Sequence, residues 1–172
     1  MTPGNGTAPI ILTALFGAAD FTLLDGLRRR HFPPERNAVP AHLTLFHHLP
    51  PTAAREILDV MKAIVRDRPA PAATLAGLIR TEQGVAVRVD SLALADMRED
   101  IADHFHGLLV AQDQQGWRAH VTIQNRADPK DAAALYQAMK AAFRPRPLTI
   151  AGLAAWWYRG GPWEALGEAR FR

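Results

Sequence analysis

The chain has 172 residues, of which 48% are hydrophobic and 22% are charged, a composition typical of one folded globular domain rather than of a disordered or fibrous chain. It contains no cysteine, which excludes disulfides, thiol nucleophiles and thiolate metal ligands. The formal charge of +3 only weakly indicates an anionic ligand. No apolar run approaches the roughly 20 residues of a membrane helix, and the N-terminus does not resemble a secretory signal. We therefore expect a cytoplasmic protein without a membrane partner.

The predicted elements follow the same order twice along the chain. Hydrophobic periodicity in the first half predicts strand, helix, strand, helix and strand over 10–16, 18–31, 41–49, 52–66 and 74–79. The second half repeats this order over 85–89, 92–112, 118–124, 131–143 and 148–158. A last strand is expected over 163–171. The repeated order predicts an internal duplication within a single domain, 1–172, with lobes of approximately 8–80 and 84–172.

One short motif occurs in the equivalent strand of each half. The segments are His42-Leu43-Thr44-Leu45 and His120-Val121-Thr122-Ile123. Because side chains alternate across a strand, the histidine and threonine of each motif share one face, and the aliphatic residues share the other. The same alternation places Phe46 and Gln124 on the two His/Thr faces. A pseudo-two-fold arrangement would bring these faces together across a groove.

Two facing imidazoles suit phosphodiester chemistry without a metal. Histidine has an ordinary pKa near 6.5, so one ring can accept a proton from a nucleophile while the other donates one to the leaving oxygen. A threonine hydroxyl on the same face can donate a hydrogen bond to a non-bridging phosphate oxygen. We expect His42 and His120 to be catalytic and Thr44 and Thr122 to bind the substrate phosphate.

The paired H-x-T-x segments resemble those of the 2H phosphoesterase superfamily, and among its members the bacterial 2'-5' RNA ligase-like proteins. The resemblance implies an α+β fold of two lobes, with two antiparallel sheets around a central cleft and helices on the outside. It also implies a phosphodiesterase or ligase acting on 2',3'-cyclic phosphates or 2'-5' linkages of RNA or nucleotides, and we expect a monomer that needs no cofactor and no metal. Relatives often carry an arginine five residues after the second histidine. Here that position is Asn125 and Arg126 follows, so we retain Arg126 with Phe46 and Gln124 as candidate substrate-binding residues.

Other functions remain open on the sequence alone. A non-catalytic RNA- or nucleotide-binding module on the same fold is the main alternative, and a metal-dependent hydrolase using clustered histidines is a less favoured one. His47 and His48 are expected to be structural or exposed, and the Arg28-Arg29-Arg30 run to complement a helix C-terminus. The Trp156-Trp157-Tyr158 run is interpreted mainly as core, with a base-stacking surface as the alternative.

Overall fold

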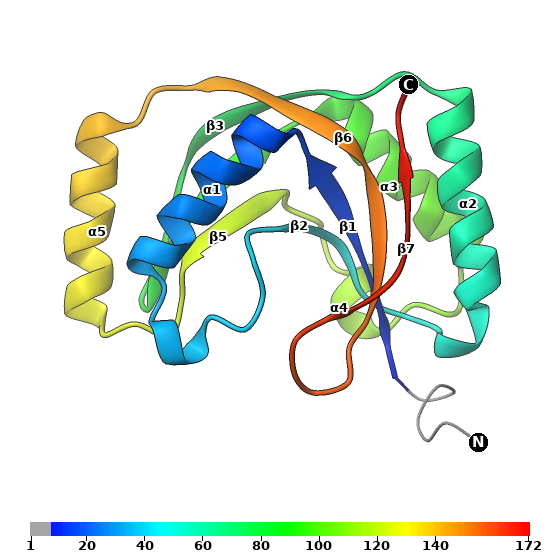
Figure 1. Ribbon diagram of the computed structural model, residues 1–172, viewed down its shortest axis with the longest axis horizontal. Coiled ribbons are helices and arrows are strands. Elements are labelled where there is room, and N and C mark those ends of the chain that lie inside the picture. The colour runs from blue at the N-terminus through cyan, green and yellow to red at the C-terminus, as the bar shows by residue number, and fades with distance from the viewer. Residues whose placement is uncertain (1–7) are drawn as a thin grey trace.

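The computed structural model describes residues 8–172 and contains seven strands in that range, all paired antiparallel (Figure 1). The strands are β1 (Ile10–Phe16), β2 (Leu43–Leu49), β3 (Ala72–Thr81), β4 (Gly84–Asp90), β5 (His120–Gln124), β6 (Arg146–Trp157) and β7 (Glu164–Arg170). The helices are α1 (Ala18–His31), α2 (Ala54–Asp67), α3 (Leu92–His104), α4 (Ala111–Gln114) and α5 (Pro129–Ala142). Single 3-10 turns precede β2 at Pro34–Arg36 and α2 at Pro51–Ala53.

The long strand β6 joins what we expected to be two separate sheets. Its first residues pair with β3, and the remainder pairs with β1 on one side and β7 on the other. The strands therefore run in the order β2-β1-β6-β3-β4-β5, with β7 also on β6. The α+β class is confirmed, but the expectation of two separate sheets is replaced by one sheet of seven strands.

The helices lie on the outside of this sheet and bury its aliphatic faces. Helix α1 packs on β5 and α5 on β3 and β4, whereas α2 packs on β6 and β7. The motif strands contribute aliphatic side chains that have no exposed surface, namely Leu43, Leu45, Val121 and Ile123. Burying such side chains is the main favourable contribution to folding, so the core fixes the face on which each motif histidine emerges.

Two predicted helices, 92–112 and 52–66, differ from the observed ones for local reasons. The helix expected over 92–112 ends at His104, because the chain turns at Gly107, whose φ of +84° favours glycine, and α4 follows separately. The helix expected over 52–66 begins at Ala54, because Thr52 lies in the preceding 3-10 turn, and Ala53 holds the cap position without a side-chain hydrogen bond. The last expected strand is confirmed as β7.

Strand β2 contains an irregularity that sequence alternation did not predict. Leu12 of β1 faces Phe46, but the next residue, Thr13, faces Thr44, so Leu45 has no partner in β1. This pattern defines a β-bulge, which shifts every following side chain to the other face. Leu45 and Phe46 are consequently both buried.

Candidate active site

The two motif histidines lie at corresponding places in the fold. His42 immediately precedes β2, and His120 is the first residue of β5. The two strands contact each other, and Figure 1 shows them beginning side by side in the middle of the molecule. The rings are close enough that a charge on His120 lowers the pKa of His42.

Both imidazoles make the same hydrogen bond to the backbone. Nδ1 of His42 lies 2.8 Å from the carbonyl oxygen of Pro40, and Nδ1 of His120 lies 2.7 Å from that of Arg118. A carbonyl oxygen only accepts, so each Nδ1 carries the hydrogen and each Nε2 is the nitrogen with a lone pair in the neutral ring. The matched bonds orient both rings and leave Nε2 of each for chemistry.

His42 sits in an aromatic environment. Its ring centroid is 4.6 Å from that of Trp163, in the connection between β6 and β7, and Trp163 in turn lies 6.2 Å from Trp156. Burial lowers the pKa of His42 to about 4; the Pro40 carbonyl opposes this effect and the positive charge of Arg28 adds to it. His42 is therefore neutral at physiological pH.

His120 lines a different and more polar cavity of about 310 Å³, together with Thr122, Gln124, Asn125 and Arg118. Gln124 is only 6% exposed, and its Oε1 atom is buried without a hydrogen-bond partner in the described part of the chain. A buried acceptor without a donor is costly. Within residues 8–172 the Gln124 side chain therefore holds an unsatisfied acceptor next to the cavity of His120.

The two motif threonines are held by their backbones, not by their side chains. The carbonyl oxygen of Thr44 accepts from Nε1 of Trp117 at 3.0 Å, and that of Thr122 accepts from Nη1 of Arg28 at 3.0 Å. Both side chains are partly buried. Within residues 8–172 neither hydroxyl is used in a hydrogen bond, so each can donate to a phosphate oxygen.

Helix α1 positions both motifs through buried charged groups. Besides its bond to Thr122, Arg28 donates from Nε to Oδ1 of Asn37 at 2.8 Å, in the segment that leads to His42. One turn earlier on the helix, Oδ1 of Asp25 accepts from the backbone N–H of Ala41 at 2.9 Å. The arginine run, predicted to complement the helix dipole, thus includes a nearly buried residue that ties β5 to the approach to His42.

Helix α3 makes the reciprocal connection to β2. Arg98 is buried and donates to the carbonyl oxygens of Leu45 and Asp113. The carboxylate of Asp113 accepts the backbone N–H groups of His47 and His48, each at 2.8 Å. Burial alone would raise the pKa of Asp113. Its hydrogen bonds to His47 and His48 lower the pKa by more, so the pKa lies below the ordinary value. Asp113 thus fixes the backbone of β2 at His47 and His48, and the side chain of His47 is exposed.

The structure contradicts one candidate substrate-binding residue, Phe46, and leaves Arg126 a prediction. Phe46 does not line a groove: it has no exposed surface, and the Arg98 guanidinium lies 4.5 Å from its ring centroid. The bulge at Leu45 accounts for this error. Arg126 is exposed in the turn after β5 with a positive φ of 57°, whereas the neighbouring Asn125 and the earlier Arg118 line the cavity of His120. Arg118 was detectable in the sequence, since it lies two residues before His120.

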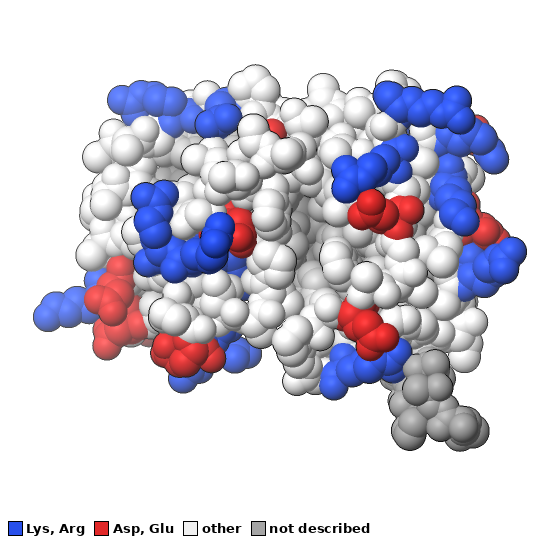
Figure 2. All heavy atoms as spheres, viewed as in Figure 1, with Lys and Arg blue, Asp and Glu red and all other residues white. Residues whose placement is uncertain are grey.

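The charged groups on the face of Figure 2 gather on two flanks and leave a hollowed, mostly uncharged band between them. In the same orientation, Figure 1 places the segment that leads to β2 in this band. Among the described residues, no three His, Asp or Glu side chains gather as they would around a metal ion. No helix in residues 8–172 has the length and apolar character of a membrane span.

Comparison with known proteins places the chain in a family. A model of the 2'-5' RNA ligase superfamily matches residues 17–162. The fold is similar to crystal structures of TT0787 of Thermus thermophilus (17% identity, TM-score 0.63) and of E. coli LigT complexed with 3'-AMP (16% identity, TM-score 0.57). Each similarity covers 95% of this chain and 98% of the other. No curated protein sequence matches the chain.

Proposed function

The chain belongs to the 2'-5' RNA ligase superfamily, and on that premise we propose that it is a phosphodiesterase or ligase acting on 2',3'-cyclic phosphates or 2'-5' linkages of RNA or nucleotides. The observation that carries the proposal is the matched pair of Nδ1 hydrogen bonds on His42 and His120. They orient two imidazoles in the same way, each with Nε2 available, as a general base and a general acid require.

The electrostatics favour one assignment of roles. His42, whose pKa burial lowers to about 4, is neutral at pH 7 and acts as the base on water or a hydroxyl. His120 then delivers a proton to the oxygen that leaves phosphorus. In hydrolysis of a cyclic phosphate, the water oxygen bonds to phosphorus, its proton passes to His42, and the broken P–O bond leaves a ribose hydroxyl protonated by His120. Ligation is the same sequence with a hydroxyl in place of water.

The threonines and Gln124 complete the proposed site. The hydroxyls of Thr44 and Thr122 donate to the non-bridging oxygens, where negative charge grows in the transition state. Gln124, whose Oε1 lacks a partner in the described chain, accepts a hydrogen bond from a substrate hydroxyl. We also propose that the two halves arose by duplication, since α1 and α3 each anchor the motif strand of the other half.

The proposal is tested by incubating the purified protein with nucleoside 2',3'-cyclic phosphates and with short 2'-5' and 3'-5' oligonucleotides, and by identifying products chromatographically. We expect opening of the cyclic phosphate or exchange at 2'-5' linkages, in the presence of EDTA, and no cleavage of 3'-5' linkages. Binding of these compounds without turnover would instead favour the non-catalytic nucleotide-binding module.

A further inference from the structure

The two histidines border cavities of different chemical character. The cavity on the His120 side contains Arg118, Gln124 and Asn125. The cavity on the His42 side, about 270 Å³, has no Lys, Arg, Asp or Glu among its lining residues within the described chain. Its walls include four aromatic side chains, those of Phe16, Phe21, Trp156 and Trp163. If the substrate phosphate lies between the histidines, the part of the substrate on one side of it meets a polar cavity, and the part on the other side meets an aromatic cavity without charged residues.

Trp163 lies in the hairpin that connects β6 and β7, and this hairpin places it at the cavity. The connection between β6 and β7 turns at Gly160, whose φ is +90°, and an ion pair between Arg159 and Glu164, 2.8 Å long, closes its base. The Arg159 guanidinium also lies over the Trp157 ring, 5.2 Å from the centroid. The hairpin extends beside the segment before β2 (Figure 1), which lets its Trp163 reach His42, remote in sequence.

Two further aromatic side chains of the cavity, Trp156 and Phe21, lie beside Trp163 in its wall. Nε1 of Trp156 donates to the hydroxyl of Thr13 at 3.0 Å, so the polar atom of that indole is satisfied within the wall. Phe21 of α1, which is 37% exposed, lines the same cavity. The cavity thus offers preformed aromatic faces and, among the described residues, no charged partner.

We propose that this cavity binds the nucleobase of the substrate and that Trp163 is the residue on which the base stacks. The inference rests on the proposed function, because it assumes that the reacting phosphate lies between His42 and His120. A base is planar, uncharged and aromatic, which matches the cavity walls, and stacking on an aromatic ring tolerates any base. The cavity, about 270 Å³, lies below the usual range of roughly 300–1,000 Å³ for sites of drug-sized molecules, so it accommodates one ring system rather than a dinucleotide.

The assignment also gives the bound substrate a direction. The stacked base lies on the His42 side, and the ribose that carries it reaches toward His120, so that the leaving ribose oxygen faces His120 and the cavity of Gln124, Asn125 and Arg118. A cyclic phosphate without a base would bind through the histidines and threonines alone. The enzyme should therefore discriminate against such compounds mainly through KM.

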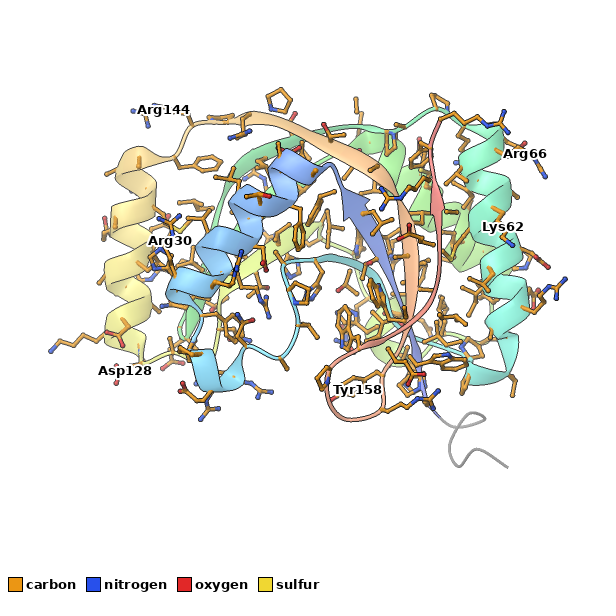
Figure 3. All side chains as sticks on the ribbon, in the orientation of Figure 1. Arg30, Lys62, Arg66, Asp128, Arg144 and Tyr158 are labelled. Atoms are coloured by element: carbon orange, nitrogen blue, oxygen red, sulfur yellow. The ribbon has the colours of Figure 1, made fainter. Side chains whose placement is uncertain are left out.

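The test uses the full chain with the change Trp163→Ala and the matched control Tyr158→Ala. Tyr158 is an aromatic residue of the same hairpin, 43% exposed and outside the cavity wall, and it is labelled at the end of the hairpin in Figure 3. Binding of adenosine 2'-monophosphate and of the base-free glycerol 2-phosphate is measured by calorimetry, and KM and kcat are measured on adenosine 2',3'-cyclic phosphate. Circular dichroism checks that both variants are folded.

We expect Trp163→Ala to weaken binding of the nucleotide about tenfold, the usual cost of losing one stacking ring, and to leave binding of glycerol 2-phosphate unchanged. KM should rise by a similar factor, and Tyr158→Ala should match the unchanged protein. Equal affinities of Trp163→Ala and wild type for the nucleotide would overturn the inference while leaving turnover, and so the proposed function, intact. Conversely, loss of nucleotide binding in a protein without turnover would support the base site and refute the proposed reaction.

Discussion

Arg28 donates a hydrogen bond from Nη1 to the backbone carbonyl of Thr122, 3.0 Å away and 94 positions later in the chain. Its Nε bonds Asn37, so one side chain connects the approach to His42 with the strand that carries His120. The planar guanidinium holds its Nε and Nη1 donors in fixed directions toward the two acceptors, whereas the donors of a lysine share one nitrogen. The relative placement of the two motifs therefore depends on a residue that is only 4% exposed and touches neither histidine through a hydrogen bond.

The first prediction concerns this connection. Arg28→Met should reduce kcat by at least about tenfold, because small displacements of catalytic groups have large kinetic costs. It should also lower the free energy of unfolding by about 1–3 kcal/mol, since the Thr122 carbonyl loses its partner. Arg30→Met on the same helix, an exposed position labelled in Figure 3, is the control. Steady-state kinetics and urea denaturation of both variants measure the two effects; a fully active Arg28→Met enzyme would show that Arg28 does not position the site.

The second prediction concerns the threonine hydroxyls. Thr44→Val and Thr122→Val should each lower kcat on the order of 10²-fold, because each removes a donor to a developing charge while preserving side-chain shape. Neither hydroxyl is used within the described chain, so stability should change little. Thr52→Val, at an exposed position before α2, serves as the control. Wild-type rates from both motif variants would remove the threonines from the site.

The third prediction concerns Gln124. Gln124→Leu should lower kcat/KM about tenfold through the loss of one substrate hydrogen bond. The same change should leave the protein as stable as wild type or more so, because it removes a buried acceptor that has no partner in the described chain. The exposed Gln137→Leu on α5 provides the comparison. A destabilised variant with unchanged kinetics would mean that Gln124 is structural.

The fourth prediction is a pH dependence. A base must be neutral to act, and the pKa of His42 is lowered to about 4, so activity should fall on the acid side only as the pH approaches about 4. Trp163→Ala exposes the ring, weakens the desolvation that lowers this pKa, and should move the acid limb of kcat/KM upward toward the ordinary histidine value of about 6.5. Rates measured from about pH 3.5 to about pH 8, with circular dichroism at each pH, check this. An acid limb already centred near the ordinary histidine pKa in the wild type would reassign the base.

The sequence was sufficient for the features that depend on local pattern. Alternation and β-branched residues located the motif strands, and the aliphatic residues Leu43, Leu45, Val121 and Ile123 are in the core as predicted. Local pattern failed at Phe46, because a bulge in β2 is decided by pairing with β1 and not by the sequence of β2 alone.

The supporting residues of the site could not be predicted because their partners are distant in the chain. Arg98 bonds a carbonyl 53 positions earlier, and Asp113 bonds backbone N–H groups 66 and 65 positions earlier. Trp163 meets His42 only through the hairpin between β6 and β7. Neither the arginine run nor Trp163 shows from the sequence which distant residue it contacts. Those contacts are set by the tertiary fold.

The central claim is that His42 and His120 act as one acid/base unit, and the most direct measurement is kcat for His42→Ala, His120→Ala and the double variant on a nucleoside 2',3'-cyclic phosphate. Each single change should cost on the order of 10²- to 10⁴-fold, because one proton transfer is left without its catalyst. The double variant should be hardly slower than either single variant, since residues that work together are strongly non-additive. Near-normal turnover by His42→Ala, or losses that simply multiply in the double variant, would contradict the paired mechanism.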